Sequence, residues 1–310
     1  MEHANPLRGI GLKLVSVAIF VAMSTLIKIL DGRIPPGEVV FFRSAFAVPV
    51  ILFWLWAAHS FGSGLKTGNY MGHFWRGLAG TVAMGFGFAG LALLPLPEVT
   101  AVGYAAPLLT VIFAAMFLGE EVRAFRIFSV GLGLAGVLIV LSPRLTALST
   151  DAAGATEALG AIVVLTGAVF AALAQVFVRK LVAVETTTAI VFYFSVNSAA
   201  LSLITLPFGW VWPDAPTAAL LVGCGLLGGV GQVFLTSSYR YADASVVAPF
   251  DYASMLLALV IGYAGFGEVP TSTVLMGAAL VIFAGILIIW RERRLGLERA
   301  RQRQSMTPQG

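Results

Sequence analysis

Charge and cysteine are the two things that this chain of 310 residues has little of. Charged residues make up 11% of it and hydrophobic residues 59%, with a mean hydropathy of +0.93, which excludes an ordinary soluble globular domain. The single cysteine, Cys224, excludes an intrachain disulfide and a four-cysteine zinc site. The composition therefore indicates a protein that lies in a membrane.

Motifs of enzymes that work inside membranes are also missing. No GxSG phrase occurs, and the three histidines, His3, His59 and His73, lie outside the long apolar runs. A presenilin-like protease needs two membrane aspartates, whereas only Asp251 lies within such a run. No phosphate-binding loop is present, so direct coupling to ATP is not expected. We therefore predict no enzymatic activity, no cofactor and no metal site.

Apolar residues gather in about ten blocks of the length that crosses a bilayer, roughly 20 residues each. The predicted spans are 10–30, 38–58, 74–94, 99–118, 124–143, 157–177, 187–207, 216–238, 245–266 and 271–290. The blocks form two sets of five, and two copies of an odd-numbered unit must enter the bilayer from opposite sides. The sequence thus predicts an all-α polytopic membrane protein: ten transmembrane helices in two five-helix inverted repeats around a central cavity, the layout of a transporter.

The Lys and Arg positions support this assignment, because cytoplasmic loops keep positive charge. With the N-terminus inside, fifteen of the nineteen Lys and Arg, Lys13 and Arg76 among them, fall in cytoplasmic segments, and only Arg33 and Arg144 fall outside. Lys28, which is expected to reach the interface, and Arg43 are the two remaining cations. Both termini are predicted to be cytoplasmic, in a cell (inner) membrane.

Four segments are expected along the chain: a first repeat at 8–143, a small polar linker at 144–156, a second repeat at 157–290 and a basic cytoplasmic tail at 291–310. A similar phrase closes each half, since Tyr104-Ala105 and Gly119-Glu120 recur as Tyr252-Ala253 and Gly267-Glu268. The arginines of the tail are typical of an anchor that stops translocation. No basic folded face is predicted, so no nucleic-acid partner is expected.

Ionisable and aromatic residues within the spans are the candidate substrate-binding residues. A charge inside the bilayer costs roughly 2.5–3.5 kcal/mol on insertion scales, which makes Asp251 and Arg43 functional candidates. Asp251 would bind a cation or an amino group, or carry a proton; the alternative is a neutral carboxyl bonded to a neighbouring helix. Tyr252 and Tyr104 are expected to face the same cavity.

Uncharged polar side chains and two prolines complete the candidate site. Gln175, Asn197, Gln232 and Tyr193 would either line the cavity or hold the bundle together. Pro107 and Pro249 lie at matching places in the fourth and ninth spans. A proline removes an intrahelical hydrogen bond, and broken helices at matching places indicate a binding site, although a purely structural kink remains an alternative.

Several short phrases, in their order and spacing, resemble the EamA family of the drug/metabolite transporter superfamily. They are EVVFFR at 38–43, HFWRG at 73–77, FLGE at 117–120, DASVVAP at 243–249 and FGE at 266–268. The first two look more like the riboflavin and S-adenosylmethionine branch than like the aromatic amino-acid exporters. The resemblance implies a ten-helix bundle around a central cavity that moves a small organic metabolite by alternating access.

The sequence leaves several alternatives open. An exporter of amino acids or drugs, and a channel or intramembrane scaffold, compete with the main hypothesis of a secondary active metabolite transporter. The expected partners are a small-molecule substrate and the lipid bilayer. Proton coupling, a monomeric or homodimeric state, the substrate and the direction of movement are not decided by these residues.

Overall fold

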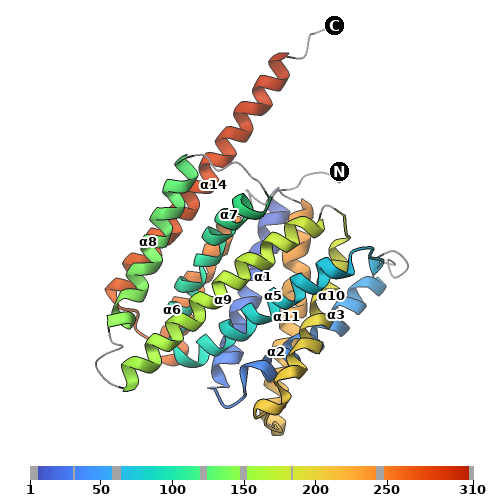
Figure 1. Cartoon of the computed structure of the whole chain (residues 1–310), viewed down its shortest axis with the longest axis vertical. Helices are drawn as coiled ribbons and strands as arrows, with labels where there is room; N and C mark the ends of the chain where they lie inside the picture. Colours follow the sequence, from blue (N-terminus) through green and yellow to red (C-terminus); the bar gives the residue numbers. More distant parts are fainter. Residues whose placement is uncertain are drawn as a thin grey trace.

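The computed structural model describes residues 6–30, 32–57, 64–118, 124–146, 152–182, 184–241 and 248–306 of the chain. These residues are almost entirely helical and contain no strand, and the helices pack into one bundle (Figure 1). The expected all-α membrane architecture is confirmed. Gly119, Glu120 and 243–247 of the sequence phrases lie outside the described residues, as does the side chain of Pro249.

Each half of the chain supplies a similar series of helices. The first half contains α1 (Pro6–Ile29), α2 (Pro36–Ala45), α3 (Ala47–Ala57), α5 (Tyr70–Leu93), α6 (Leu96–Gly103), α7 (Ala105–Leu118) and α8 (Ala124–Thr146). The second half contains α9 (Ala152–Val182), α10 (Thr187–Ser202), η2 (Leu203–Phe208), α11 (Ala215–Tyr241), η3 (Ala248–Tyr252), α13 (Ala253–Phe266) and α14 (Ser272–Met306).

Among the described residues, seven stretches of helix are long and apolar enough to cross a membrane, and three further apolar helices are shorter: Ile127–Pro143, Phe250–Phe266 and Ser272–Ile288. All ten fall within or across the predicted spans. The number of complete crossings therefore stays a prediction. Helices also extend into both ends of the expected 144–156 linker, and α14 continues through most of the expected tail, projecting beyond the bundle (Figure 1).

Prolines break the helices of the second and fourth spans by one mechanism. A proline at position i has no N–H for the carbonyl at i−4. In the fourth span α6 ends at Gly103, four residues before Pro107; in the second, α2 ends at Ala45, four residues before Pro49. The second break was not among the predictions. In the ninth span, Pro249 lies within the short 3-10 helix η3 that precedes α13.

The pattern of helix contacts repeats when the first and second halves of the chain are exchanged. α1 packs on α11 as α5 packs on α9, α1 meets α13 as α9 meets α7, and α8 packs against α14 (Figure 1). Two hydrogen bonds between the halves follow the same pattern. Glu38 in α2 accepts from the Val211 amide after η2 at 3.0 Å, and Glu185 before α10 accepts from the Gly68 amide before α5 at 3.2 Å. An internal two-fold relation between oppositely oriented halves would give this pattern, and that orientation stays a prediction.

Glycine allows the closest of these contacts. A Cβ on Gly225 of α11 would overlap the Cβ of Phe46 and lie 2.7 Å from the carbonyl oxygen of Phe42, at the break between α2 and α3. Small residues let membrane helices approach and gain dispersion contacts that the hydrophobic effect does not supply in lipid. The break of the second span is thus packed directly against α11.

Candidate functional site

A cavity of about 330 Å³ lies between α1, α5, α6 and the start of the ninth span. Its walls are mainly apolar, with the rings of Phe20 and Phe88 among them. Four polar side chains reach it: Ser24, Thr100, Asp251 and Ser254. Apolar walls with a few convergent polar groups are typical of small-molecule sites. Residues of both halves form the walls, so a movement between the halves would change the shape of the cavity.

An ion pair joins the two halves at the wall of this cavity. Lys13 Nζ of α1 lies 2.7 Å from Asp251 Oδ1 of η3. The lysine side chain is 2% exposed, whereas the aspartate side chain is 50% exposed. Lys13 lies inside the bundle, where pairing with a carboxylate offsets the cost of desolvating the ammonium, and its place on the cytoplasmic side stays a prediction. The exposed half of Asp251 leaves carboxylate surface available to a ligand.

The two candidate tyrosines lie next to this pair. The Tyr104 hydroxyl is 2.6 Å from Ser254 Oγ, and Ser254 in turn donates to the Asp251 carbonyl at 2.7 Å. The Tyr104 and Tyr252 rings meet edge to face at 5.1 Å. Tyr252 directs its hydroxyl to Gly285 of α14, where an added Cβ would overlap it. Tyr104 thus positions the segment that carries Asp251, and Tyr252 anchors that segment to α14.

Arg43 lies in a second buried group with Arg76 and Phe194. Both guanidinium groups lie over the Phe194 ring, with Cζ to centroid distances of 5.6 Å for Arg43 and 3.8 Å for Arg76. Arg43 is 5% exposed. Arg76, expected in a cytoplasmic segment, instead has its Nε and Nη1 atoms buried. The break between α2 and α3 and the length of α5 bring these side chains from different helices to one ring of α10.

The other polar candidates lie elsewhere in the bundle. Asn197 Nδ2 of α10 donates to the His73 carbonyl of α5 at 3.1 Å, and the Tyr193 hydroxyl donates to the Leu65 carbonyl at 3.2 Å. Both bonds join the two halves. Gln175 is exposed on α9, and Gln232 is half-buried on α11. None of the four is among the residues that line the 330 Å³ cavity.

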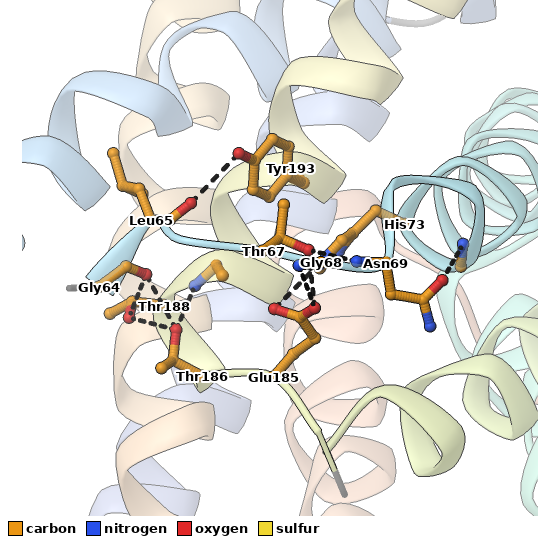
Figure 2. Close-up of polar contacts among 12 residues, drawn as sticks. Gly64, Leu65, Thr67, Gly68, Asn69, His73, Glu185, Thr186, Thr188 and Tyr193 are labelled. Atoms are coloured by element: carbon orange, nitrogen blue, oxygen red, sulfur yellow. Dashed lines mark hydrogen bonds and ion pairs between the residues drawn. The ribbon is translucent and has the colours of Figure 1, made fainter.

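Around Glu185, at what we call the Glu185 end, a network of hydrogen bonds joins the halves (Figure 2). Glu185 Oε1 accepts from the Thr67 hydroxyl at 2.7 Å and from the Gly68 amide at 3.2 Å, and Oε2 lies 3.7 Å from His73 Nε2. Burial raises the pKa of the Glu185 carboxyl, but the bonds from Thr67 and Gly68 and the charge of His73 outweigh burial and hold this pKa below its usual 4.5. Thr186 and Thr188 both donate to the Gly64 carbonyl in the same network.

The opposite end of the bundle, which we call the Glu268 end, is closed by a second ion pair. Lys28 Nζ of α1 lies 2.8 Å from Glu268 Oε1 and 2.9 Å from the Leu94 carbonyl, and Glu268 Oε2 accepts from the Leu96 amide at 2.9 Å. The Lys28 and Glu268 side chains are 14% and 15% exposed. The Lys28 ammonium thus turns to a carboxylate of the other half, and its depth relative to the membrane interface stays a prediction.

The sequence predicts the helices, but it does not show which charged residues pair with one another. Lys13 and Arg76 count as cytoplasmic charges in the sequence because each lies near the end of an apolar block, and Glu185 is not among the candidate residues. Glu268 carried a usable signal, since its phrase Phe-Gly-Glu repeats the end of the first half. No pattern within one helix shows that Lys13 faces residue 251, which is 238 positions away in the chain.

A helical membrane bundle whose charged cavity lies between two related halves has the architecture of a transporter. The chain belongs to the EamA-like transporter family, whose model matches residues 7–142 and 158–291. The sequence-based resemblance is thereby confirmed, and the family matches fall on either side of the segment between α8 and α9.

Curated relatives of similar length share this family resemblance. The chain is 28% identical over 288 residues to an S-adenosylmethionine uptake transporter of Rickettsia felis, covering 93% of this chain and 94% of the relative. It is 28% identical over 284 residues to a pseudopaline exporter of Pseudomonas aeruginosa, with 90% and 95% coverage. It is also 30% identical over 225 residues to a riboflavin transporter of Rhizobium johnstonii, with 71% and 72% coverage.

A solved crystal structure shares the fold. It aligns with a TM-score of 0.64 at 22% sequence identity, covering 93% of this chain and 98% of the other. This likeness concerns the fold alone. Taken with the family match, it supports a membrane protein that moves a small metabolite.

Proposed function

We propose that this protein is a secondary active transporter of a small organic metabolite that carries an amino group, working by alternating access in the cytoplasmic (inner) membrane with both termini in the cytoplasm. The Lys13–Asp251 pair carries the proposal. It joins the two halves at the wall of the cavity, and the half-exposed carboxylate can exchange the lysine ammonium for a ligand amine. Relatives named for S-adenosylmethionine and pseudopaline transport support a metabolite of this kind.

The cavity walls suggest what else the ligand contains. Phe20 and Phe88 offer ring surfaces, and Ser24, Thr100 and Ser254 offer hydroxyl groups. A ligand with an apolar or aromatic body and a few hydrogen-bonding groups would fill such a space. The volume of about 330 Å³ suits one small metabolite rather than a peptide.

The two ends of the bundle support alternation. The halves are joined at the Glu268 end by Lys28–Glu268 and at the Glu185 end by Thr67, Gly68 and Glu185. Opening one end while the other stays closed would expose the cavity to one side of the membrane at a time. In the predicted topology, the Glu185 end faces the cytoplasm, because Lys66 lies in its loop and Arg179 and Lys180 lie near the end of α9 that enters it.

Counterflow in proteoliposomes tests this function. Vesicles preloaded with unlabelled S-adenosylmethionine, riboflavin or single amino acids are diluted into a trace of the same labelled compound. A carrier accumulates the label transiently and saturates, whereas a channel does neither. No counterflow with any amino-bearing compound of this set would contradict the proposed substrate class.

Variants of the ion pair locate the site. Asp251→Asn removes the charge that attracts an amine, and we expect initial uptake to fall about tenfold or more, the effect of losing one charge-assisted contact. Asp214→Asn is the matched control, since Asp214 caps α11 through a bond from the Thr217 amide and Asn caps nearly as well. Equal uptake by wild type and Asp251→Asn would place the substrate elsewhere.

A further inference from the structure

Arg43 and Arg76 form a cationic group that lacks a carboxylate partner within the described residues. The ion pairs of that part of the chain involve Lys13, Lys28 and His73, and neither arginine takes part in one. Arg43 Nε, Arg76 Nε and Arg76 Nη1 are buried without a hydrogen-bond partner. A buried charged donor left unpaired is costly, so this arrangement calls for an acceptor from outside the chain.

The Phe194 ring satisfies only part of this demand. A guanidinium over an aromatic ring gains roughly 0.5–2 kcal/mol. Two guanidinium groups share the one ring, and they repel each other. An anion between them would remove the repulsion and accept from the planar donors, which match a carboxylate or a phosphate.

Glycines make room for the two guanidinium groups. A Cβ on Gly80 of α5 would overlap Arg76 Nη1, and a Cβ on Gly228 of α11 would lie 3.0 Å from Arg43 Nε. Alanine at either place would push a guanidinium away from its present position. The two glycines therefore leave a space in the bundle that the guanidinium groups fill. An arginine on the surface needs no such space.

Two helices, α1 and α5, run from this group to the wall of the 330 Å³ cavity. The same Gly228 Cβ would lie 3.3 Å from Met23 Sδ, and Ser24, the next residue of α1, lines the cavity. Along α5, Gly80 beside Arg76 is seven residues from Gly87 of the cavity wall, about 10 Å at 1.5 Å per residue. One extended molecule could therefore reach both Asp251 and the arginines.

We propose that Arg43 and Arg76 bind an anionic group, a carboxylate or a phosphate, of the transported molecule. The inference rests on the proposed function in that it gives this molecule a second charge, opposite to the amine held by Asp251. The transported metabolite is then a zwitterion or amino acid derivative whose two charged groups are well separated. A lipid headgroup carries the same phosphate chemistry, but the depth of Arg43 within α2, α10 and α11 favours the metabolite.

Binding is tested without transport, with inorganic phosphate and acetate as probes. The thermal unfolding midpoint of the purified protein in neutral detergent is followed by tryptophan fluorescence while chloride is replaced at constant ionic strength. We expect a rise of about 3 °C in wild type that exceeds the rise in Arg43→Gln and in Arg76→Gln, where little remains. Phosphate also stabilises proteins without binding, so the difference between variants is the result that counts.

Matched variants keep the test decisive. Arg33→Gln removes an exposed arginine and should respond as wild type does. If Arg43→Gln does not fold, Arg43→Lys and Gly80→Ala replace it: each keeps positive charge at the site but disturbs the planar donors or their position, and each should reduce the shift. Equal shifts in all variants, or no shift in wild type with either probe, would overturn the inference.

A lipid arm separates the two sources of the anion. The variants are compared in nanodiscs of neutral phosphatidylcholine and in nanodiscs that also contain phosphatidylglycerol. Arginine-dependent stabilisation by phosphatidylglycerol, with none by the soluble probes, would assign the site to a headgroup and overturn the metabolite assignment. Counterflow without an anion effect would sink this inference alone, and an arginine-dependent anion effect without counterflow would sink the transport function while an anion site at the two arginines stands.

Discussion

Two carboxylates of the second half close opposite ends of the bundle with different partners. Glu268 accepts from the Lys28 ammonium and the Leu96 amide, whereas Glu185 accepts from the Thr67 hydroxyl and the Gly68 amide. The 24 residues of α5, about 36 Å of helix, separate the two ends. One end is therefore closed by opposite charges and the other mainly by neutral donors.

The two ends differ in which polar groups lose their partners when that end opens. Opening the Glu268 end separates a mostly buried ammonium from its carboxylate, which costs free energy until water or another group reaches both. Opening the Glu185 end exposes hydroxyl and amide groups that water satisfies readily. We infer that the Glu185 end opens at the lower free-energy cost in the absence of substrate.

Removing the Glu268 charge should have the largest effect on stability. Glu268→Gln leaves Lys28 mostly buried without a counter-charge, and we expect the free energy of unfolding to fall by about 3 kcal/mol. The double variant Lys28→Met, Glu268→Gln carries no unpaired charge and should recover at least part of this loss. Reversible denaturation in mixed micelles measures both, and equal losses in the two variants would contradict the account.

Removing the Glu185 acceptor should have a smaller effect. Glu185→Ala deletes the bonds from Thr67 and Gly68, at roughly 1 kcal/mol each, so we expect a loss of about 2 kcal/mol. Glu185→Gln is the matched control, because its amide oxygen can still accept both bonds. If alanine destabilises the protein more at position 185 than Glu268→Gln does, the ranking of the two ends is wrong.

Thr186 tests a single contact between the halves at the Glu185 end. Its hydroxyl accepts from the Ala189 amide at 3.2 Å, capping α10, and donates to the Gly64 carbonyl of the other half at 2.9 Å. Thr186→Ala should cost about 1 kcal/mol. Thr166→Ala is the control, since Thr166 only bonds the Ile162 carbonyl within its own helix. Thermal unfolding of the two variants side by side decides the point.

Acid should weaken the Glu185 end. The folded-state pKa of Glu185 lies below 4.5, so its contribution to stability is fully present above that pH and is lost as the pH falls through the lowered pKa. Wild type should lose its stability advantage over Glu185→Gln only below about pH 4.5. A constant difference between the two proteins down to pH 3 would show that the carboxylate charge at this end contributes nothing.

The family and the membrane architecture could be predicted because both follow from short-range patterns. Apolar runs of bilayer length, alternating basic loops and the EVVFFR and FGE phrases are all visible in consecutive residues. The break of the fourth span followed from Pro107 in the same way. The equivalent break before Pro49 follows from the same rule, although Pro49 is not among the predicted kinks.

What the sequence determined by itself is where helices form and that they lie in lipid, since both depend on local hydrogen bonding and on the hydropathy of neighbouring residues. The packing of the helices settled that Lys13 meets Asp251, that Lys28 meets Glu268 and that two arginines share Phe194 with no carboxylate partner in the described part of the chain. The physical reason is that a charge in a bilayer takes its counter-charge from whichever helix packs against it, and that choice depends on the rotation and depth of helices far apart in the chain.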